Sequence, residues 1–423
     1  MQEQDNKRKM IFLSSSFPYG KGEKTFITPE LERLVEDYDV TLASHADEED
    51  KKDVKNLTKV DQSIPVLHFE SHTSLAKKVW WGLCYFADKD CWQEIKEIIK
   101  GKKHFLMRLY QSMGFYILTM NEIKNIQKAN LLSQEEYVLC YSYWYTYYCY
   151  AYLKLKKKFP NLKVITRTHG VDLYNERTKG MRQPFKRIMD KSLDGIIFAA
   201  QYAKDYYLRS FSDHSNEKRY AVCRLGVPET VKWGHKRTGT FCLLSCAYTI
   251  PLKRIELIIQ ALAVLQNERI HWIHIGDGNC FMKLSDYAHT KLADKDNITY
   301  EFKGYMDNCQ IRKIYEEGID GFITTSSTEG GCPVSIQEAM SYGVPVIGTD
   351  VGGITEMIHK NGFLLPANPS PWTVAEAIKK LYYMEKEEIE QLSRNSYETW
   401  QDKFNLTVNL NNLLVTIHNM EGS

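Results

Sequence analysis

The stretch from residue 321 to residue 348 constrains the fold of this chain most strongly. It predicts a short buried strand at 321–324, a polar loop, a helix that begins at Pro333 and ends at Gly343, and a second apolar strand at 344–348. Strands joined through a helix in this way run parallel in one sheet. The stretch therefore predicts an α/β protein.

The loop between the first strand and the helix is suited to an anion. A helix N-terminus presents N–H groups without partners and the positive end of the helix dipole, which favour a group such as a diphosphate. Gly330 and Gly331 carry no Cβ, so a ligand can approach the backbone closely. Glu329 in the loop and Glu338 in the second helical turn can accept hydrogen bonds from sugar or ribose hydroxyls.

The pattern Glu-Gly-(x)-Pro-x-Ser-x-x-Glu-Ala-Met-x-x-Gly-x-Pro-Val-Ile in this stretch resembles the donor-site signature of retaining GT-B glycosyltransferases of family 4. It is similar in particular to the group 1 transferases that build capsular polysaccharide or exopolysaccharide. The resemblance implies that Glu338 holds the ribose, that Glu329 holds the donor sugar, and that Gly330, Gly331 and Cys332 line the donor site. The family usually has seven residues between the two glutamates, whereas this chain has eight.

Length and composition limit the number of domains, the possible partners and the expected location of the protein. A chain of 423 residues is long enough for two α/β domains, and a net charge of +2 gives no electrostatic case for a nucleic-acid partner. No apolar run approaches the roughly 18 residues that a membrane-spanning helix needs. The apolar block at residues 10–13 is too short for a signal peptide, so we expect a cytoplasmic protein with reduced cysteines.

The resemblance implies a GT-B architecture, in which two Rossmann-like domains with parallel sheets face each other across a cleft. We expect an acceptor-binding domain over residues 1–229 and a nucleotide-sugar-binding domain over residues 230–396. We expect residues 397–423 to form a terminal helix that returns to the first domain.

Two segments of the first domain carry candidate site residues. A strand at 9–14 leads into a loop with Gly22 and Glu23, at the sheet edge where α/β proteins bind ligands. A later strand delivers His169 and Asp172 in an Arg-x-His-Gly-x-Asp block that resembles the histidine motif of the family. The resemblance implies that His169 lies over the transferred sugar and that Gly22, Glu23 and Asp172 lie on the acceptor side. A solvated turn is an equally good interpretation of Glu23.

The second domain is expected to open with a buried strand at 241–246, followed by Lys253 and Arg254. At this point the family usually has an arginine, four further residues and then Lys-Gly, with both cations on the diphosphate. Lys253 matches the lysine, Tyr248 stands at the arginine position and Arg254 replaces the glycine. Our hypothesis is that Arg254 supplies the second positive charge, and the alternative is an ordinary surface arginine.

Further candidates follow the next two strands. Gly276 and Gly278 form a Gly-x-Gly turn after a strand, which fits a nucleotide-binding domain, and the resemblance implies that Tyr305 lies near the nucleobase. Cysteines and histidines also lie on neighbouring strands, but we favour buried thiols over a zinc site and expect neither a metal nor a cofactor. The members of this group are Cys242, Cys246, His271 and His274.

Residues 45–135 give the least specific pattern. Basic and aromatic residues are mixed at Lys77, Lys78, Trp80 and Trp81, and basic residues recur over 100–104. This mixture fits a face for a membrane surface or a lipid acceptor, and it also fits a solvated helix with buried aromatic residues.

We therefore interpret the chain as a retaining, metal-independent hexosyltransferase with Lys253, Arg254, His169 and Glu329 as catalytic residues. The expected donor is a UDP- or GDP-linked sugar, and the expected acceptor is a glycan or a polyprenyl-linked saccharide, with peripheral contact at the inner face of the cytoplasmic membrane. Two alternatives stay open. A GT-B nucleotide-sugar epimerase would need no acceptor, and a non-catalytic nucleotide-sugar-binding partner would bind a donor without turnover.

Overall fold

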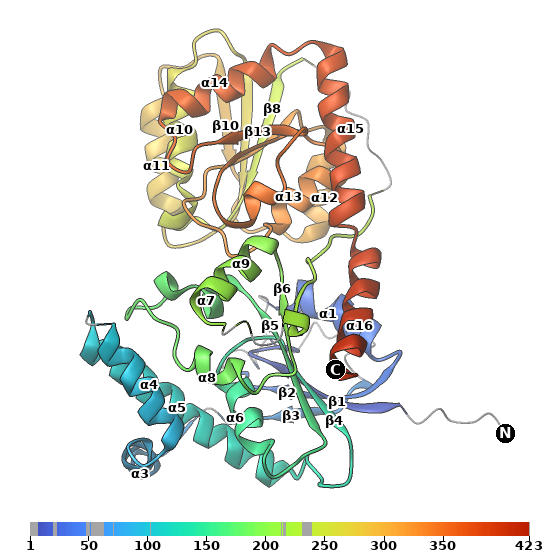
Figure 1. Cartoon of the computed structure of the whole chain (residues 1–423). Coiled ribbons are helices and arrows are strands. Elements are labelled where there is room, and N and C mark those ends of the chain that lie inside the picture. Colours follow the sequence, from blue (N-terminus) through green and yellow to red (C-terminus); the bar gives the residue numbers. More distant parts are fainter. Residues whose placement is uncertain are drawn as a thin grey trace, which may run out of the picture. The chain divides into compact units, whose positions relative to one another are not determined.

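The computed structural model describes residues 7–19, 23–47, 51, 63–70, 72–101, 103–212, 214, 217–230 and 239–422. Gly22 lies outside these residues. The chain divides into two compact units, which we describe separately (Figure 1). Unit 1 comprises Met1–Cys223 and Leu410–Ser423, and unit 2 comprises Arg224–Asn409.

Unit 1 contains a parallel sheet of seven strands in the order β3-β2-β1-β4-β5-β6-β7. The strand order reverses between β1 and β4, and α/β proteins bind ligands at the carboxyl edge beside such a switch point. The strands are β1 (Arg8–Ser14), β2 (Tyr38–Ser44), β3 (Val66–His68), β4 (Val138–Ser142), β5 (Leu162–Thr168), β6 (Gly195–Phe198) and β7 (Tyr220–Val222).

One face of this sheet is covered by α1 (Lys24–Leu34) and by the end of α16 (Leu406–Glu421). Ile417 and Met420 of α16 are buried in the same core as Phe12 of β1, so a segment from the far end of the sequence completes unit 1. The carboxylate of Glu421 fixes this segment, because it accepts hydrogen bonds from the Tyr38 hydroxyl at 2.6 Å and the Tyr137 hydroxyl at 2.7 Å.

The remaining helices of unit 1 include a group that the sequence left unassigned. Residues 75–129 form three helices, with α5 packed on α3, α4 and α6. The helix α6 packs in turn against β4 and β5. The bounds are α3 (Leu75–Tyr85), α4 (Lys89–Lys100), α5 (Phe105–Ala129), α6 (Tyr147–Leu155), α7 (Gly170–Leu173), α8 (Lys186–Asp190) and α9 (Gln201–Ser210), with 3-10 turns η2 (Asn175–Arg177) and η3 (Glu217–Arg219).

Unit 2 contains a parallel sheet of six strands in the order β10-β9-β8-β11-β12-β13, so its switch point lies between β8 and β11. The two parallel sheets confirm the expected pair of Rossmann-like folds. The strands are β8 (Phe241–Cys246), β9 (Ile270–Ile275), β10 (Ile298–Phe302), β11 (Gly321–Thr324), β12 (Val346–Thr349) and β13 (Gly362–Leu365).

Helices cover both faces of the unit 2 sheet (Figure 1). On one face α10 (Ile255–Val264), α11 (Phe281–Leu292) and α14 (Pro371–Tyr382) enclose a core that contains Trp272 and Leu243. The other face carries α12 (Asn308–Glu317), α13 (Val334–Ser341) and α15 (Lys386–Lys403). The 3-10 turns are η4 (Pro251–Lys253) and η5 (Gly352–Glu356).

The C-terminal helix differs from the expectation. We expected one terminal helix over residues 397–423, but the helix breaks at Phe404 and Asn405, between α15 and α16. Val227 causes this break, because its N–H donates to the Phe404 carbonyl at 3.0 Å and its carbonyl accepts from the Leu406 N–H at 3.1 Å. Across the described part of the chain, no helix combines the length and the apolar character that crossing a bilayer requires.

Candidate functional site

The loops after β8 and β11 are joined by hydrogen bonds at the switch point of unit 2. The Ser327 N–H donates to the Leu252 carbonyl at 2.8 Å, and the Thr325 hydroxyl donates to the Arg254 carbonyl at 2.9 Å. These bonds hold the predicted cation loop against the predicted donor loop, so the two parts of the expected donor site lie side by side.

Lys253 and Glu329 form an ion pair across these loops. Lys253 Nζ lies 2.5 Å from Glu329 Oε1, and the Ser326 hydroxyl donates to the same oxygen at 2.6 Å. Both charged side chains are largely buried, at 20% and 13% exposure. The structure thus brings together a cation expected on the diphosphate and a carboxylate expected on the donor sugar.

Arg254 has a different environment from the one that we expected. Its Nε donates to the Thr325 carbonyl at 2.6 Å, and its terminal nitrogens donate to the carbonyls of Ser326 and Ala367 at 2.8 Å and to Asn368 Oδ1 at 3.0 Å. Its backbone is left-handed, with φ of 48°. The guanidinium therefore ties three loops of unit 2 together.

Glycines let these loops approach closely. A Cβ on Gly353 would lie 2.4 Å from the backbone of Gly331, and one on Gly352 would lie 2.0 Å from the Glu329 carbonyl oxygen. Cys332 is buried beside them, with its thiol 3.6 Å from the Gly353 carbonyl oxygen. The turn after β12 is thus the support on which the donor loop rests.

Glu338 occupies the second turn of α13, as predicted. Among the described residues, its carboxylate makes no hydrogen bond, although it lies near the Arg312 guanidinium and the Cys246 thiol. Burial raises the pKa of the Glu338 carboxyl to about 7, and the charge of Arg312 opposes this effect only partly. A desolvated carboxylate without a partner is suited to receive ligand hydroxyls.

The remaining candidates of unit 2 mainly shape its loops. A Cβ on Gly276 would lie 1.9 Å from the Ala247 carbonyl oxygen, and one on Gly278 would lie 2.9 Å from the Thr249 carbonyl oxygen. Both glycines therefore allow the loop after β9 to pack on the loop after β8. Tyr305 follows β10 and is exposed, as is Tyr248 at the position of the family arginine.

In unit 1, Glu23 connects the loops on the two sides of the switch point. Its carboxylate accepts hydrogen bonds from the N–H groups of Ser16 at 2.5 Å and Phe17 at 2.7 Å, and from the indole N–H of Trp144. Glu23 is 6% exposed. These contacts give it the role of holding the loop after β1 in place.

His169 lies at the carboxyl end of β5, against the rings of Tyr143 and Trp144, with both ring centroids 4.7 Å away. Its Nε2 is buried and makes no hydrogen bond within the described residues. Burial and the nearby Arg167 guanidinium lower the pKa of the His169 imidazole to about 3, so the ring is neutral at physiological pH.

Asp172 fixes the loop that carries His169. One of its oxygens accepts the His169 N–H and the other accepts the Tyr145 N–H, both at 2.7 Å. Burial raises the pKa of the Asp172 carboxyl, and the buried ammonium of Lys186 opposes that effect. Lys186 in turn donates to the Tyr145 carbonyl.

Two residues of these sites, Trp144 and Arg224, were not predicted from the sequence. Trp144 bonds Glu23 and packs on His169, and Arg224 donates to Glu356 Oε2 at 2.6 Å beside the Cys332 thiol. A signal for Trp144 was its place directly after β4, but only the strand order shows that β4 borders the switch point. Arg224 lies close to the predicted boundary between the two domains, and the sequence alone does not indicate which side chain it contacts.

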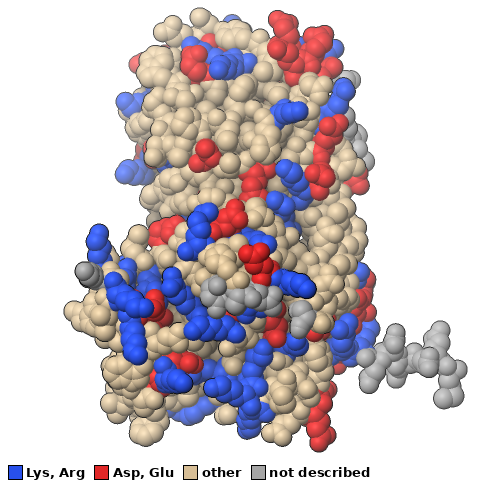
Figure 2. Space-filling view, in the orientation of Figure 1, with Lys and Arg blue, Asp and Glu red and all other residues tan. Residues whose placement is uncertain are grey.

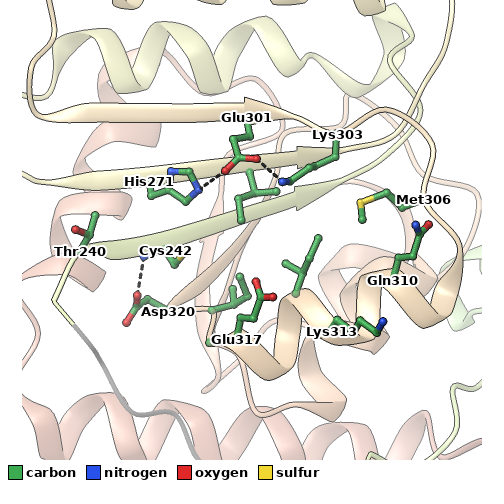
Figure 3. Close-up of a pocket in the computed structure, with 14 residues that line it drawn as sticks. Thr240, Cys242, His271, Glu301, Lys303, Met306, Gln310, Lys313, Glu317 and Asp320 are labelled. Carbon is green, nitrogen blue, oxygen red and sulfur yellow. Dashed lines mark hydrogen bonds and ion pairs between the residues drawn. The ribbon is translucent and has the colours of Figure 1, made fainter.

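A hollow in unit 2 lies between strands β8, β9, β10 and helix α12 (Figure 3). Its volume is about 460 Å³. His271 Nε2 lies 3.2 Å from Glu301, which also pairs with Lys303, and the Cys242 N–H donates to Asp320. Within the described ranges, no group of three or more His, Cys, Asp or Glu side chains is placed to hold a metal ion.

Known proteins resemble parts of this chain. Residues 240–383 match the family described as glycosyl transferases group 1. The putative teichuronic acid biosynthesis glycosyltransferase TuaC of Bacillus subtilis is 33% identical over 246 residues, which cover 56% of this chain and 59% of that protein. The putative colanic acid biosynthesis glycosyltransferase WcaL of Escherichia coli is 26% identical over 269 residues, 58% and 62% of the two chains. The matched region thus spans about three fifths of each relative.

Solved structures resemble the chain over almost its whole length. The apo form of the lipopolysaccharide outer core galactosyltransferase WaaB matches with a TM-score of 0.68 at 15% identity, covering 97% of this chain and 99% of that one. Anabaena Alr3699/HepE in complex with UDP-glucose matches with a TM-score of 0.64 at 15% identity, with the same coverage. This protein therefore has the GT-B fold, and residues 240–383 of its unit 2 are similar to the glycosyl transferases group 1 family.

Proposed function

We propose that the protein is a retaining glycosyltransferase of cell-surface polysaccharide biosynthesis. It transfers a hexosyl group from a UDP- or GDP-linked sugar to a glycan or a polyprenyl-linked saccharide, and it works in the cytoplasm. Support comes from the group 1 domain and from relatives named for teichuronic and colanic acid biosynthesis. The fold is also that of a protein solved with UDP-glucose.

The observation that carries this proposal is the environment of Glu338. The Glu338 side chain is half-buried, and its carboxylate has no hydrogen-bond partner among the described residues to offset the cost of its desolvation. Two vicinal hydroxyls of a ribose would supply such partners. Glu338 is thus proposed to bind the ribose of the nucleotide, beside the loop that receives the diphosphate.

Lys253 and the N-terminus of α13 are proposed to stabilise the leaving group. Negative charge grows on the β-phosphate as the sugar departs, and preorganised cations and N–H groups stabilise that charge selectively in the transition state. Gly330 and Gly331 leave room for the phosphates at this helix end, beside the buried Cys332. No step of this proposal uses a metal.

The contacts of Arg254 change our proposal for that residue. Its guanidinium donors bond to loop carbonyls, so we assign it the role of holding Lys253 and the donor loop in position rather than binding phosphate itself. Glu329 is proposed to bind hydroxyls of the donor sugar after the diphosphate has replaced it as the partner of Lys253. Gly276, Gly278 and Tyr305 complete the nucleotide side of the site.

In unit 1, His169 is proposed to donate or accept one hydrogen bond with the transferred sugar through Nε2. Asp172 and Glu23 orient the acceptor-side loops, because their carboxylates bind backbone N–H groups of those loops. Gly22 remains a proposed acceptor-side residue outside the described part of the chain.

The proposal is tested first by a thermal-shift screen of UDP-, GDP- and ADP-sugars with the full chain. We expect one nucleotide series to raise the melting temperature, and Glu338→Ala to abolish the shift while Glu376→Ala, on the exposed face of α14, preserves it. No shift with any nucleotide-sugar would overturn the donor site.

The second test is turnover of the stabilising donor, with and without polyprenyl diphosphate-linked saccharides, in buffer containing EDTA. Transfer with the anomeric configuration retained supports the proposal. Conversion of the donor sugar without an acceptor would identify an epimerase, and binding without any turnover would identify a non-catalytic partner.

A further inference from the structure

Exposed apolar side chains in unit 1 are concentrated on α3 and on the start of α5. Trp80 and Leu83 are each 64% exposed, and Leu106 is 78% exposed. Water-facing groups of this size gathered in one region mark an interaction surface rather than ordinary scatter. The main members of this surface are Leu75, Val79, Trp80, Leu83, Leu106 and Tyr110.

The helix α3 carries apolar side chains both on its buried side and on its exposed side. Trp81 and Tyr85 face inward and are buried. Leu75, Val79 and Leu83 follow one another at intervals of four residues, which places them in one stripe along the outward side. A helix that only covered the core would carry polar residues on that side.

Lysines border this outward stripe. Lys77 and Lys78 are exposed within α3, and Lys100 and Lys103 are exposed beside the start of α5. Figure 2 shows Lys and Arg side chains interspersed with uncharged surface over the region of α4 and α5. The surface therefore combines apolar and cationic groups.

The acidic residues of this region do not cancel that charge. Glu94 is buried in an ion pair with Arg182 at 2.9 Å, and Asp88 pairs with Lys154 at 2.9 Å. Arg182 and Lys154 come from outside the three helices and neutralise these carboxylates. Glu97 pairs with Lys100 at 2.7 Å, which leaves the exposed Lys77, Lys78 and Lys103 in excess. The surface is consequently complementary to an anionic partner.

We propose that this face of α3 and α5 docks on the surface of an anionic lipid bilayer. The apolar side chains of Leu75, Val79 and Leu83 enter the boundary of the acyl chains, and Trp80 lies at the head-group level. Lys77 and Lys78 attract the anionic head groups. The helix lies along the interface, which needs an outward apolar stripe but not the length of a membrane span.

Docking of this kind is independent of the donor site. It is measured without nucleotide-sugar or acceptor, so a failure of the glycosyltransferase proposal and a failure of this proposal give different results. A bilayer is favoured over a protein partner because the surface joins an apolar stripe to exposed lysines, which suit a fluid layer of anionic head groups.

The test is co-flotation of the full chain with large unilamellar vesicles. One set contains phosphatidylglycerol and phosphatidylethanolamine, and the other contains phosphatidylcholine alone. Four variants are compared with the unmodified protein. Val79→Ser/Leu83→Ser alters the stripe, and Val408→Ser/Val415→Ser alters two exposed valines of α16 as its control. Lys77→Gln/Lys78→Gln alters the charge, and Lys386→Gln/Lys360→Gln alters two exposed lysines of unit 2 as its control.

We expect flotation with the anionic vesicles and little with phosphatidylcholine. The stripe variant should weaken binding by at least about tenfold, because it removes two apolar side chains from the boundary of the acyl chains. The Lys77/Lys78 variant should also weaken binding by at least about tenfold, because each lysine near an anionic surface contributes about fivefold. Both control variants should bind as the unmodified protein does. Circular dichroism and melting temperature verify that each variant is folded.

Three outcomes would overturn the proposal. The protein fails to float with either vesicle, or the stripe variant binds as well as its α16 control. Alternatively, light scattering shows a dimer that Val79→Ser/Leu83→Ser converts to a monomer, which would make this face an interface between copies of the chain.

Discussion

Lys253 Nζ and Glu329 Oε1 lie 2.5 Å apart, so two side chains with separate proposed roles form an ion pair. In the proposed reaction, a diphosphate competes with Glu329 for the ammonium, and a donor sugar competes with Lys253 for the carboxylate. The proposal therefore requires the pair to separate when the donor binds, and the strength of the pair opposes binding.

Removing the charge of Glu329 should make this competition easier. We expect Glu329→Gln to bind UDP or GDP about fivefold more tightly than the unmodified protein, since no ion pair has to be broken. Turnover of the nucleotide-sugar should fall because the sugar loses a charged acceptor. Calorimetry with the nucleotide and with the nucleotide-sugar separates the two effects. Weaker binding of the nucleotide would show that the pair supports the site rather than competing with the ligand.

Removing the ammonium of Lys253 should slow the reaction more than it weakens donor binding. Lys253→Ala is expected to lower kcat by about 10²- to 10³-fold, as removal of one preorganised charge contact to a developing anion does. Steady-state kinetics and donor titration measure the two quantities, with Lys291→Ala on the exposed side of α11 as the matched control. An unchanged kcat would remove Lys253 from the leaving-group role.

The pKa of Glu338 predicts how donor binding depends on pH. With a pKa of about 7, the carboxyl is protonated below that pH and becomes a poorer acceptor for ribose hydroxyls. Affinity for the nucleotide-sugar should therefore fall about tenfold for each pH unit below 7 if only the ionised form binds. Glu338→Gln should bind more weakly at pH 8 and should lose this pH dependence. The same slope in both proteins would contradict the assignment.

The same pKa has a consequence for stability. Because folding raises the pKa of Glu338 above its ordinary value, its contribution to stability is fully present below about pH 4.5 and is lost as the pH rises through 7. At pH 8 the free energy of unfolding of Glu338→Gln should exceed that of the unmodified protein by up to about 3 kcal/mol. Denaturant unfolding at pH 5 and pH 8 measures this difference, which should shrink at the lower pH.

His169 should affect turnover without contributing a titration. Its imidazole pKa of about 3 keeps the ring neutral from pH 5 to pH 9. His169→Ala is expected to lower kcat by about 10²-fold through loss of one polar contact, by the same factor at pH 5.5 and pH 8.5. His289→Ala, on the exposed side of α11, is the control. A factor that changes with pH would show that the ring titrates during the reaction.

Gly353 should be intolerant of a side chain. A Cβ there meets backbone atoms of Gly331 at 2.4 Å, and backbone atoms cannot move aside cheaply. Gly353→Ala is expected to destabilise unit 2 by about 1–3 kcal/mol and to weaken donor binding by shifting the loop. Gly114→Ala is the matched control, because no atom lies within 4 Å of that Cβ and alanine favours the helix α5. Calorimetric melting compares the stability of the two variants, and donor titration compares their affinity for the donor.

The local pattern of the donor stretch was readable from the sequence. Strand β11 lies where the apolar run at residues 321–324 predicts it, and α13 begins directly after Pro333. These elements depend on hydrophobic runs, proline and glycine, whose preferences act over a few residues. Lys253 and Glu338 were accordingly placed in the correct loop and helix.

The directions of several side chains were not readable. Arg254 lies beside Lys253 in sequence, yet its left-handed backbone turns its guanidinium toward the carbonyls of β11 and of the loop after β13. Glu23 likewise bonds backbone N–H groups and Trp144, which lies 121 positions away. Such contacts depend on which strands are neighbours, and a single sequence does not give the strand order.

The return of α16 to unit 1 affects the order in which the chain is completed during synthesis. Leu413, Leu414, Ile417 and Met420 cover an apolar face of the unit 1 core, but a ribosome adds them only after all of unit 2. At ordinary elongation rates, that face of the nascent protein stays exposed for roughly 10–40 s before α16 is synthesised. Unit 1 therefore matures after unit 2, and the uncovered surface is a binding target for molecular chaperones during that interval.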